Sequence, residues 1–232
     1  MELKESILKS LSLKDTSEEF KNLDKNNELE KIVPKINEMK EVGECKYHVV
    51  NCFEHSINAL REFEDIINDE NFFPEHLMDL VWDYLNTKID LNISRLEILK
   101  LGIFIHDIGK PDAKTIDETG RVHFKGHEKI GGDIAIKLGK RLSLSEKAID
   151  TLFNYVRYHM ILLVFYKKNN LTKENLFEVF DKIGEDIIGI MLLGYADIVS
   201  TRKLLNPDEK VGTIKTYMEF ILTNYEYRYK RK

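Results

Sequence analysis

Residues 183–200 read IGEDIIGIMLLGYADIVS, and apolar side chains fall on nearly every side of a helix drawn through them. A helix that is apolar all round is buried, so this stretch predicts the central helix of the fold. The same helical spacing of apolar residues recurs along the chain, over residues 51–67, 94–106, 127–139, 145–159 and 207–222. The sequence therefore predicts an all-α fold, a helical bundle around residues 183–200.

Polar residues mark where several of these helices begin. Ser94 followed by Glu97 fits a capping box, Ser145 fits a second N-cap, and Pro207 fits a first helical turn. Residues 115–124 predict either a short hairpin, turning at the sequence DETG, or a loop. Residues 1–44 read as short charged amphipathic helices, so we expect a small helical extension packed on a main domain of residues 45–232.

Composition limits the classes of protein to consider. The 232 residues suit one domain or one domain with an appendage, and the net charge of −5 argues against a broad grip on nucleic acid. Two cysteines, Cys45 and Cys52, form neither a disulfide framework nor a cysteine zinc site. The longest uncharged apolar run, residues 187–196, is short against the ~20 residues of a membrane span. With no signal-peptide core at the N-terminus, these features predict a cytoplasmic protein with no membrane partner.

Histidine and aspartate side chains fall on the inward faces of the predicted helices. Asp197 is the most informative, because an unpaired carboxylate in an apolar helix costs free energy unless it is paired, hydrogen-bonded or bound to metal. Helices that each send one imidazole or carboxylate toward a common centre are how bundles build metal sites. The candidates are His55, His106, Asp107, His127, His159 and Asp197.

Each histidine also has an ordinary interpretation, as a hydrogen-bonded residue of the core. We assign His76 and His123 to that class or to the surface, and His48 either to it or to the mouth of the site. The joint pattern favours the metal site, because core histidines have no reason to gather at the inward ends of four helices beside two acids.

Several segments of the sequence resemble a known family. The segments that carry the resemblance are HVVNCFEHSINAL (48–60), LGIFIHDIGKP (101–111), VHFKGHEKIGGDIA (122–135), VRYHM (156–160) and GYADIVSTR (194–202). They resemble the HD-domain superfamily of metal-dependent phosphohydrolases, and most of all the HD domain attached to bacterial tRNA nucleotidyltransferases and poly(A) polymerases. Residues before 45 leave no room for a nucleotidyltransferase head, so we expect a freestanding HD domain.

The resemblance implies a ligand set and a reaction. One divalent metal ion would be held by His55, His106, Asp107 and Asp197. A second ion would be held by His127 and His159, with Asp107 as the bridging ligand. A mononuclear form of the site would not use His127 and His159. Nitrogen and oxygen ligands suit Fe, Mn, Ni, Co, Zn or Mg. A metal-activated hydroxide would then hydrolyse a phosphomonoester or phosphodiester of a small nucleotide-like substrate: a nucleotide, a cyclic nucleotide or an RNA-end phosphate.

Lys110 completes the predicted catalytic set with Asp107. It follows the His-Asp doublet in IHDIGKP, where Pro111 predicts a turn that points Lys110 into the mouth of the site, to bind a phosphate oxygen of the substrate. The other interpretation of Lys110 is a surface lysine, and Arg202 is a second candidate for the phosphate-binding role.

Three further alternatives stay open. The chain could be a non-catalytic, metal-containing module that senses a ligand, although a full ligand set with Lys110 favours an enzyme. Residues 161–166 (ILLVFY) read as core, or in part as lining of the substrate mouth. The basic, tyrosine-rich stretch 225–232 reads as a frayed terminus or as a platform for single-stranded nucleic acid. The oligomeric state is left open.

Overall fold

The computed structural model describes residues 2–42, 50–206, 208 and 211–230. It is an all-α bundle with one two-stranded sheet, so the predicted fold class is confirmed. The α-helices are α1 (Glu2–Leu11), α2 (Thr16–Lys25), α3 (Ile36–Lys40), α4 (Cys52–Asn68), α5 (Glu75–Asn86), α6 (Arg95–Ile105), α7 (Lys110–Ala113), α8 (His127–Arg141), α9 (Glu146–Tyr158), α10 (Ile161–Lys168), α11 (Lys173–Ile183), α12 (Ile187–Leu205) and α13 (Gly212–Asn224). The strands are β1 (Thr115–Ile116) and β2 (Val122–His123).

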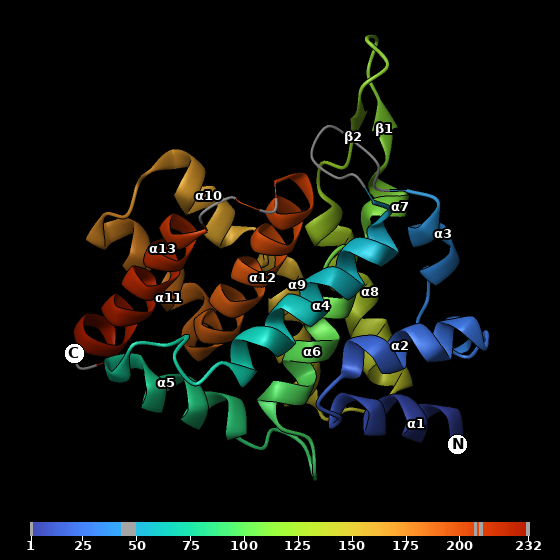
Figure 1. The fold of residues 1–232 in the computed structure, drawn as a ribbon, viewed down its shortest axis with the longest axis horizontal. Coiled ribbons are helices and arrows are strands. Elements are labelled where there is room, and N and C mark those ends of the chain that lie inside the picture. Colours follow the sequence, from blue (N-terminus) through green and yellow to red (C-terminus); the bar gives the residue numbers. More distant parts are fainter. Residues whose placement is uncertain (1, 43–49, 207, 209–210, 231–232) are drawn as a thin grey trace.

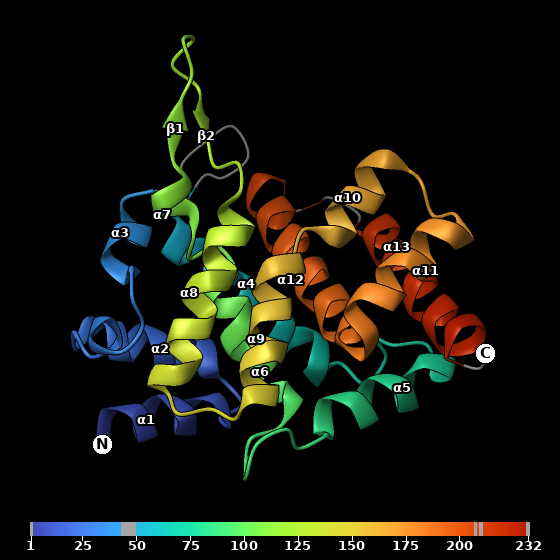
Figure 2. The same cartoon turned by 180° about the vertical axis from the view of Figure 1, so that it is seen from behind.

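Helix α12 forms the centre of the bundle, as its sequence predicts, but it runs from Ile187 to Leu205 rather than over 183–200, because Ile183 ends α11 and Gly184–Asp186 form a 3-10 turn. All residues from 187 to 196 are buried, and α4, α6, α9, α10 and α13 pack around it. Figure 1 shows α4 crossing the front of the bundle over α12, and Figure 2, seen from behind, shows α8 and α9 at the back of the bundle. A residue on α12 can therefore meet residues from several neighbouring helices.

Local signals correctly place the starts of two helices. Ser94 and Glu97 form a complete capping box, with the Ser94 backbone N–H donating to Glu97 Oε2 at 2.7 Å. The Ser145 hydroxyl accepts from the Ala148 backbone N–H at 3.3 Å and caps α9. The predicted helix over 207–222 begins at Gly212, and Pro207 lies outside the described residues.

Residues 115–123 form the hairpin that the sequence left as one of two possibilities. Thr115 pairs with His123 and Ile116 with Val122, while Asp117 Oδ1 accepts the backbone N–H groups of Thr119 and Arg121 in the turn. The hairpin projects from the bundle beside α7 (Figure 1).

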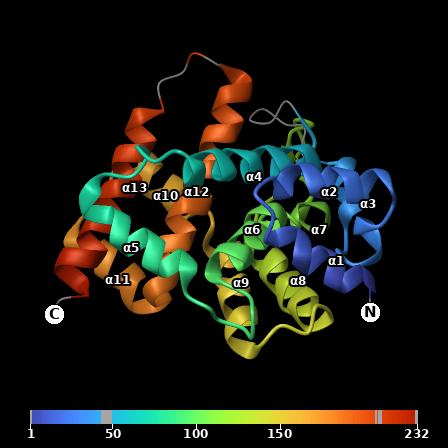
Figure 3. The same ribbon diagram turned by 60° about the horizontal axis from the view of Figure 1, so that its bottom comes forward.

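The N-terminal helices pack on the bundle through a buried polar contact. Figure 3 shows α1, α2 and α3 together against α4 and α6. The carboxylate of Glu64 on α4 accepts from the Ser17 backbone N–H at 3.0 Å and from the Ser17 hydroxyl at 2.5 Å. Lys100 on α6 donates to Thr16 Oγ1 at 3.1 Å. The expected domain boundary at 44/45 falls in residues 43–49, outside the described residues, and stays a prediction.

The buried Glu64 predicts a pH dependence of stability. Burial raises the pKa of Glu64 above its usual 4.5, against the opposing effect of its Ser17 hydrogen bonds, so the folded chain binds more protons here than the unfolded chain. The contribution of this group to the free energy of unfolding is full below pH 4.5 and falls as pH rises through the folded pKa.

Urea unfolding of the wild type and of Glu64→Gln across pH 4–7 measures this contribution. We expect the difference in free energy of unfolding, wild type minus variant, to decrease as pH rises. The matched control is Glu18→Gln, one residue after Ser17 and 58% exposed, for which the difference should stay flat. A wild-type advantage that grows with pH would contradict the assignment.

The structure contains helices that the sequence analysis did not predict: α5, α7, α10 and α11. In α7, Pro111 lies in the first helical turn, where the sequence predicts only a turn of the backbone. It also gives the C-terminal tyrosines a packing role. Tyr225 is buried, and the Tyr229 ring lies 5.5 Å from Phe177 and 5.3 Å from Phe180 on α11, with its hydroxyl donating to Asp181. The frayed terminus expected here is therefore wrong for Tyr225 and Tyr229, and these two rings are occupied by packing rather than free to stack on bases.

Candidate metal centre

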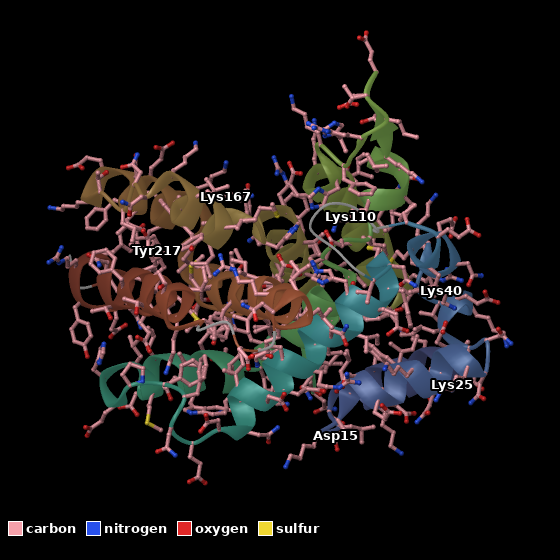
Figure 4. All side chains as sticks on the ribbon, turned by 45° about the horizontal axis from the view of Figure 1, so that its top comes forward. Asp15, Lys25, Lys40, Lys110, Lys167 and Tyr217 are labelled. Carbon is pink, nitrogen blue, oxygen red and sulfur yellow. The ribbon has the colours of Figure 1, made fainter. Side chains whose placement is uncertain are left out.

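Five helices bring the six predicted ligands to one place. His55 lies in the first turn of α4, His127 begins α8, and Asp197 lies within α12, while His106 and His159 are the C-cap residues of α6 and α9. Asp107 follows His106. Figure 1 shows the ends of α4, α6 and α8 meeting near the foot of the hairpin, where Lys110 is labelled in Figure 4.

Asp107 stands between two groups of histidines. Its Oδ2 lies 3.2 Å from His106 Nε2 and 3.6 Å from His55 Nε2. Its Oδ1 lies 3.2 Å from His127 Nε2 and 3.8 Å from His159 Nε2. Asp107 thus joins two sets of three possible ligands, His55–His106–Asp107 and Asp107–His127–His159, in each of which the ligand atoms lie within 4.8 Å of one another.

Asp197 adds a second carboxylate to the first set. Its Oδ1 lies 2.9 Å from His55 Nε2 and 3.6 Å from His106 Nε2. Burial raises the pKa of Asp197, but the hydrogen bonds and positive charge of the two histidines outweigh this and hold it well below its usual value. The buried carboxylate of Asp197 on the central helix is therefore paired with two histidines.

Hydrogen bonds fix which nitrogen of three histidines faces the centre. The Nδ1 atoms of His106, His127 and His159 lie 2.7, 2.8 and 2.7 Å from the carbonyl oxygens of Ile103, Phe124 and Val156. Because a carbonyl oxygen can only accept, each Nδ1 must carry a proton. Each Nε2 is then free to act as a metal ligand, and a backbone carbonyl is a usual partner for the other nitrogen of a metal-bound histidine.

The inward-facing nitrogens fit divalent metal ions. His127 Nε2 and His159 Nε2 lie 3.2 Å apart, as do His55 Nε2 and His106 Nε2. Two lone pairs at this distance repel each other unless a proton or a cation lies between them. Imidazole and carboxylate groups without thiolate suit borderline and hard divalent ions.

Without metal, the buried histidines would differ in charge. Burial lowers the pKa of His106, but the neighbouring Asp107 and Asp197 raise it to about 10. Burial and the adjacent His106 lower the pKa of His159 to about 3. His106 would thus carry a second proton, on Nε2, while His159 would be neutral with its one proton on Nδ1. A metal ion at the first set would have to displace the Nε2 proton of His106.

Lys110 is part of this buried centre. It is 5% exposed, and its Nζ lies 2.5 Å from Asp107 Oδ2. Burial raises the pKa of Asp107, but Lys110 and His106 together hold it well below its usual value. The alternative of a surface lysine is therefore wrong. Lys110 pairs with a predicted ligand, and its contact with a phosphate oxygen of the substrate stays a prediction.

A close backbone approach holds the His-Asp turn against α8. A Cβ placed on Gly109 would lie 2.1 Å from the His127 carbonyl oxygen and 2.6 Å from the Gly131 nitrogen. Gly131 in turn faces Val156 on α9. Glycine at 109 therefore lets α8 come near enough for His127 to reach Asp107.

His76, His123 and Arg202 lie outside the two sets of ligands. His76 contacts Thr223 Oγ1 at 3.0 Å and His123 contacts Asp117 Oδ2 at 2.7 Å, both at exposed positions, as expected. The Arg202 guanidinium lies 5.0 Å from the centre of the Tyr166 ring. His48 and Cys45 lie outside the described residues, while Cys52 is buried.

A cavity lies next to His127, and its walls include Ile161, Val164 and Phe165, in the segment that the sequence predicts as core or in part as lining of the substrate mouth. The sequence analysis missed two other wall residues, Arg157 and Tyr158, and their place just before His159 in the segment VRYHM was the available signal.

Comparison with known proteins agrees with this geometry. The family model described as the HD domain matches residues 52–184, which include five of the six predicted ligands and end before Asp197. The A-adding tRNA nucleotidyltransferase of Deinococcus radiodurans is 24% identical over 136 residues, 58% of this chain, and the match spans about a quarter (26%) of that protein. In the described part of the chain, no helix has the length and apolarity needed to cross a membrane. With more than half of its length matched by the family model, the chain belongs to the HD domain family.

Proposed function

We propose that this HD domain protein is a phosphohydrolase that cleaves a phosphomonoester or phosphodiester of a nucleotide, a cyclic nucleotide or an RNA end. The observation that carries the proposal is the position of Asp107, whose two oxygens face two separate pairs of histidines. A carboxylate in this position suits a bridge between two metal ions, the arrangement used for in-line displacement at phosphorus.

The predicted ligands divide into two sub-sites. Asp107 belongs to both; His55, His106 and Asp197 belong to the first, and His127 and His159 to the second. Two divalent ions bound here would lower the pKa of water and offset the negative charge of the phosphoryl group. We further propose that the metals are drawn from Fe, Mn, Ni, Co, Zn and Mg.

The protein's own groups hold the arrangement. The carbonyls of Ile103, Phe124 and Val156 orient three imidazoles. Lys110 offsets part of the negative charge of Asp107 at 2.5 Å and limits where that carboxylate can turn.

The second candidate function, a metal-containing module that senses a ligand without turnover, predicts a different result in one assay. Metal-stripped protein is loaded in turn with Mn²⁺, Ni²⁺, Co²⁺, Zn²⁺, Fe²⁺ or Mg²⁺, and phosphate or alcohol release is measured on a panel of phosphomonoesters and phosphodiesters. Turnover of at least one class supports the enzyme. Metal-loaded protein that releases product from no member of the panel favours the sensing module.

Metal stoichiometry tests the second sub-site. We expect two metal ions per wild-type chain and about one in His127→Ala, because this change removes a ligand from the second set and leaves the first complete. Mass spectrometry of metals in the dialysed proteins measures the ratio. His123→Ala is the matched control. His123 lies four residues before His127 and pairs with the exposed Asp117, so this variant should keep two metal ions per chain. One ion in the wild type would indicate the mononuclear form.

A further inference from the structure

A cavity of about 630 Å³ lies beside the candidate metal centre and shares His127 with it. It is bounded by the start of α8, the end of α9, α10 and α11, on the side of the molecule where Figure 4 labels Lys167 on α10. Cavities of this size hold small organic ligands, which occupy sites of roughly 300–1,000 Å³.

His127 belongs both to this cavity and to the candidate metal centre. Its side chain is 11% exposed, more than those of His55, His106 and His159 at 1%. His127 is therefore the predicted ligand that connects the candidate metal centre with the cavity.

The walls of the cavity have two chemical characters. Ile161, Val164, Phe165 and Val179, from α10 and α11, give an apolar surface. Asn170 and Asn175 add side-chain amides, which can both donate and accept hydrogen bonds. An apolar wall with a few hydrogen-bonding groups suits a flat heteroaromatic ring better than it suits a hydrocarbon chain or a sugar alone.

The charges at the cavity favour an anionic ligand. The side chains that line the cavity include three cationic ones, Lys125, Arg157 and Lys168, and two anionic ones, Glu128 and Glu178. The chain as a whole, in contrast, carries a net charge of −5.

Arg157 is held at the end of the cavity near His127. It pairs with Glu128 at 3.4 Å, and its guanidinium lies 5.4 Å from the centre of the Tyr158 ring. Lys182 lies 5.1 Å from that same ring centre. Arg157 is therefore a cation in the cavity wall, held by Glu128 and the Tyr158 ring.

We infer that this cavity binds the nucleoside part of a nucleotide, with the base against the α10–α11 wall and the phosphate directed past Arg157 to the metal centre. The inference rests on the proposed function for the position of the phosphate, and it narrows the substrate class to a mononucleotide or to a terminal nucleotide. Binding of the nucleoside itself depends on the cavity alone.

Two variants test the cavity. Val164 is 43% exposed and lines it, so Val164→Trp fills the space without disturbing buried packing. Arg157→Met removes the fixed cation. The matched control is Leu91→Trp, which adds the same ring at a residue 95% exposed in the loop between α5 and α6.

The first measurement is NMR titration of metal-free protein with adenosine and cytidine, which carry no phosphate. We expect binding by the wild type and Leu91→Trp, and a loss of affinity of roughly tenfold or more in Val164→Trp, because the indole occupies the space of the base. Absence of nucleoside binding in the wild type, or equal affinity in Val164→Trp, would overturn the inference.

The second measurement separates this inference from the proposed function. With metal-loaded protein, kcat/KM is measured for AMP, CMP and glycerol phosphate. We expect Val164→Trp to lower kcat/KM for the nucleotides by roughly tenfold more than for glycerol phosphate, and Arg157→Met to raise KM for the nucleotides. Nucleoside binding without hydrolysis of any ester would reject the proposed function and keep the cavity assignment. Hydrolysis with equal losses for all three esters would reject the cavity assignment and keep the proposed function.

Discussion

Asp107→Ala is expected to abolish phosphate-ester hydrolysis, lowering kcat/KM by about 10³-fold or more, since metal-ion catalysis supplies several kcal/mol. Asp107 faces all four inward histidines within 3.2–3.8 Å, so the change removes a ligand from both sub-sites at once. Bound metal should fall in both, while the far-UV helical signal persists. Phosphate release, metal analysis and circular dichroism measure the three effects on one preparation.

The loss of Asp107 also leaves Lys110 as a buried cation without its 2.5 Å partner, which costs about 3–5 kcal/mol when a buried pair is broken. The double variant Asp107→Ala/Lys110→Met removes both charges and separates lost chemistry from lost stability. Asp117→Asn is the matched control, because Asp117 also pairs with a histidine but lies in the exposed hairpin turn. Wild-type activity in Asp107→Ala would refute the proposed centre.

Gly109→Ala is expected to have the second largest effect. The added Cβ would lie 2.1 Å from the His127 carbonyl oxygen and 2.6 Å from the Gly131 nitrogen, and both of these are backbone atoms that no rotamer change can move. Overpacking costs about 1–3 kcal/mol, and a contact with rigid backbone belongs at the upper end. We therefore expect the free energy of unfolding to fall by about 3 kcal/mol, with a loss of metal from the second sub-site as α8 shifts.

Gly212→Ala is the control for this change. A Cβ at Gly212, the first residue of α13, would meet no other part of the described chain within 4 Å. The free energy of unfolding of Gly212→Ala should therefore differ from that of the wild type by less than about 0.5 kcal/mol. Urea unfolding measures both variants. Equal stability of Gly109→Ala and Gly212→Ala would show that the His-Asp turn does not hold α8 in the way the distances indicate.

Local patterns were sufficient for the central helix and for the helix starts. Residues 187–196 have no charged side chain, so the hydrophobic effect favours their burial. The capping box at Ser94 depends only on residues three positions apart. The ligands could be predicted for a related reason: each lies at a fixed helical spacing from apolar residues, so its direction follows from the direction of the core.

Contacts between distant residues were beyond that reasoning. The buried Arg95 donates to Asp186 and Glu185, some 90 positions later, and to the Tyr84 hydroxyl at 3.2 Å. No local pattern shows that Arg95 has these partners. The packing of the Tyr229 ring depends in the same way on where α11 lies, and the cavity beside His127 depends on where α10 and α11 lie. Lys110 was predicted in the site, but its buried pair with Asp107 appears only in three dimensions.

The central claim is that the chain hydrolyses phosphate esters through metal ions held by the six predicted residues. Titration of metal-stripped protein with Mn²⁺, with phosphate release from a mononucleotide as the readout, tests it most directly. We expect no release without metal, a rise that saturates near two equivalents per chain, and no comparable rise in Asp107→Ala. The claim would be contradicted if phosphate release were unaffected by metal removal, or if Asp107→Ala released phosphate as fast as the wild type.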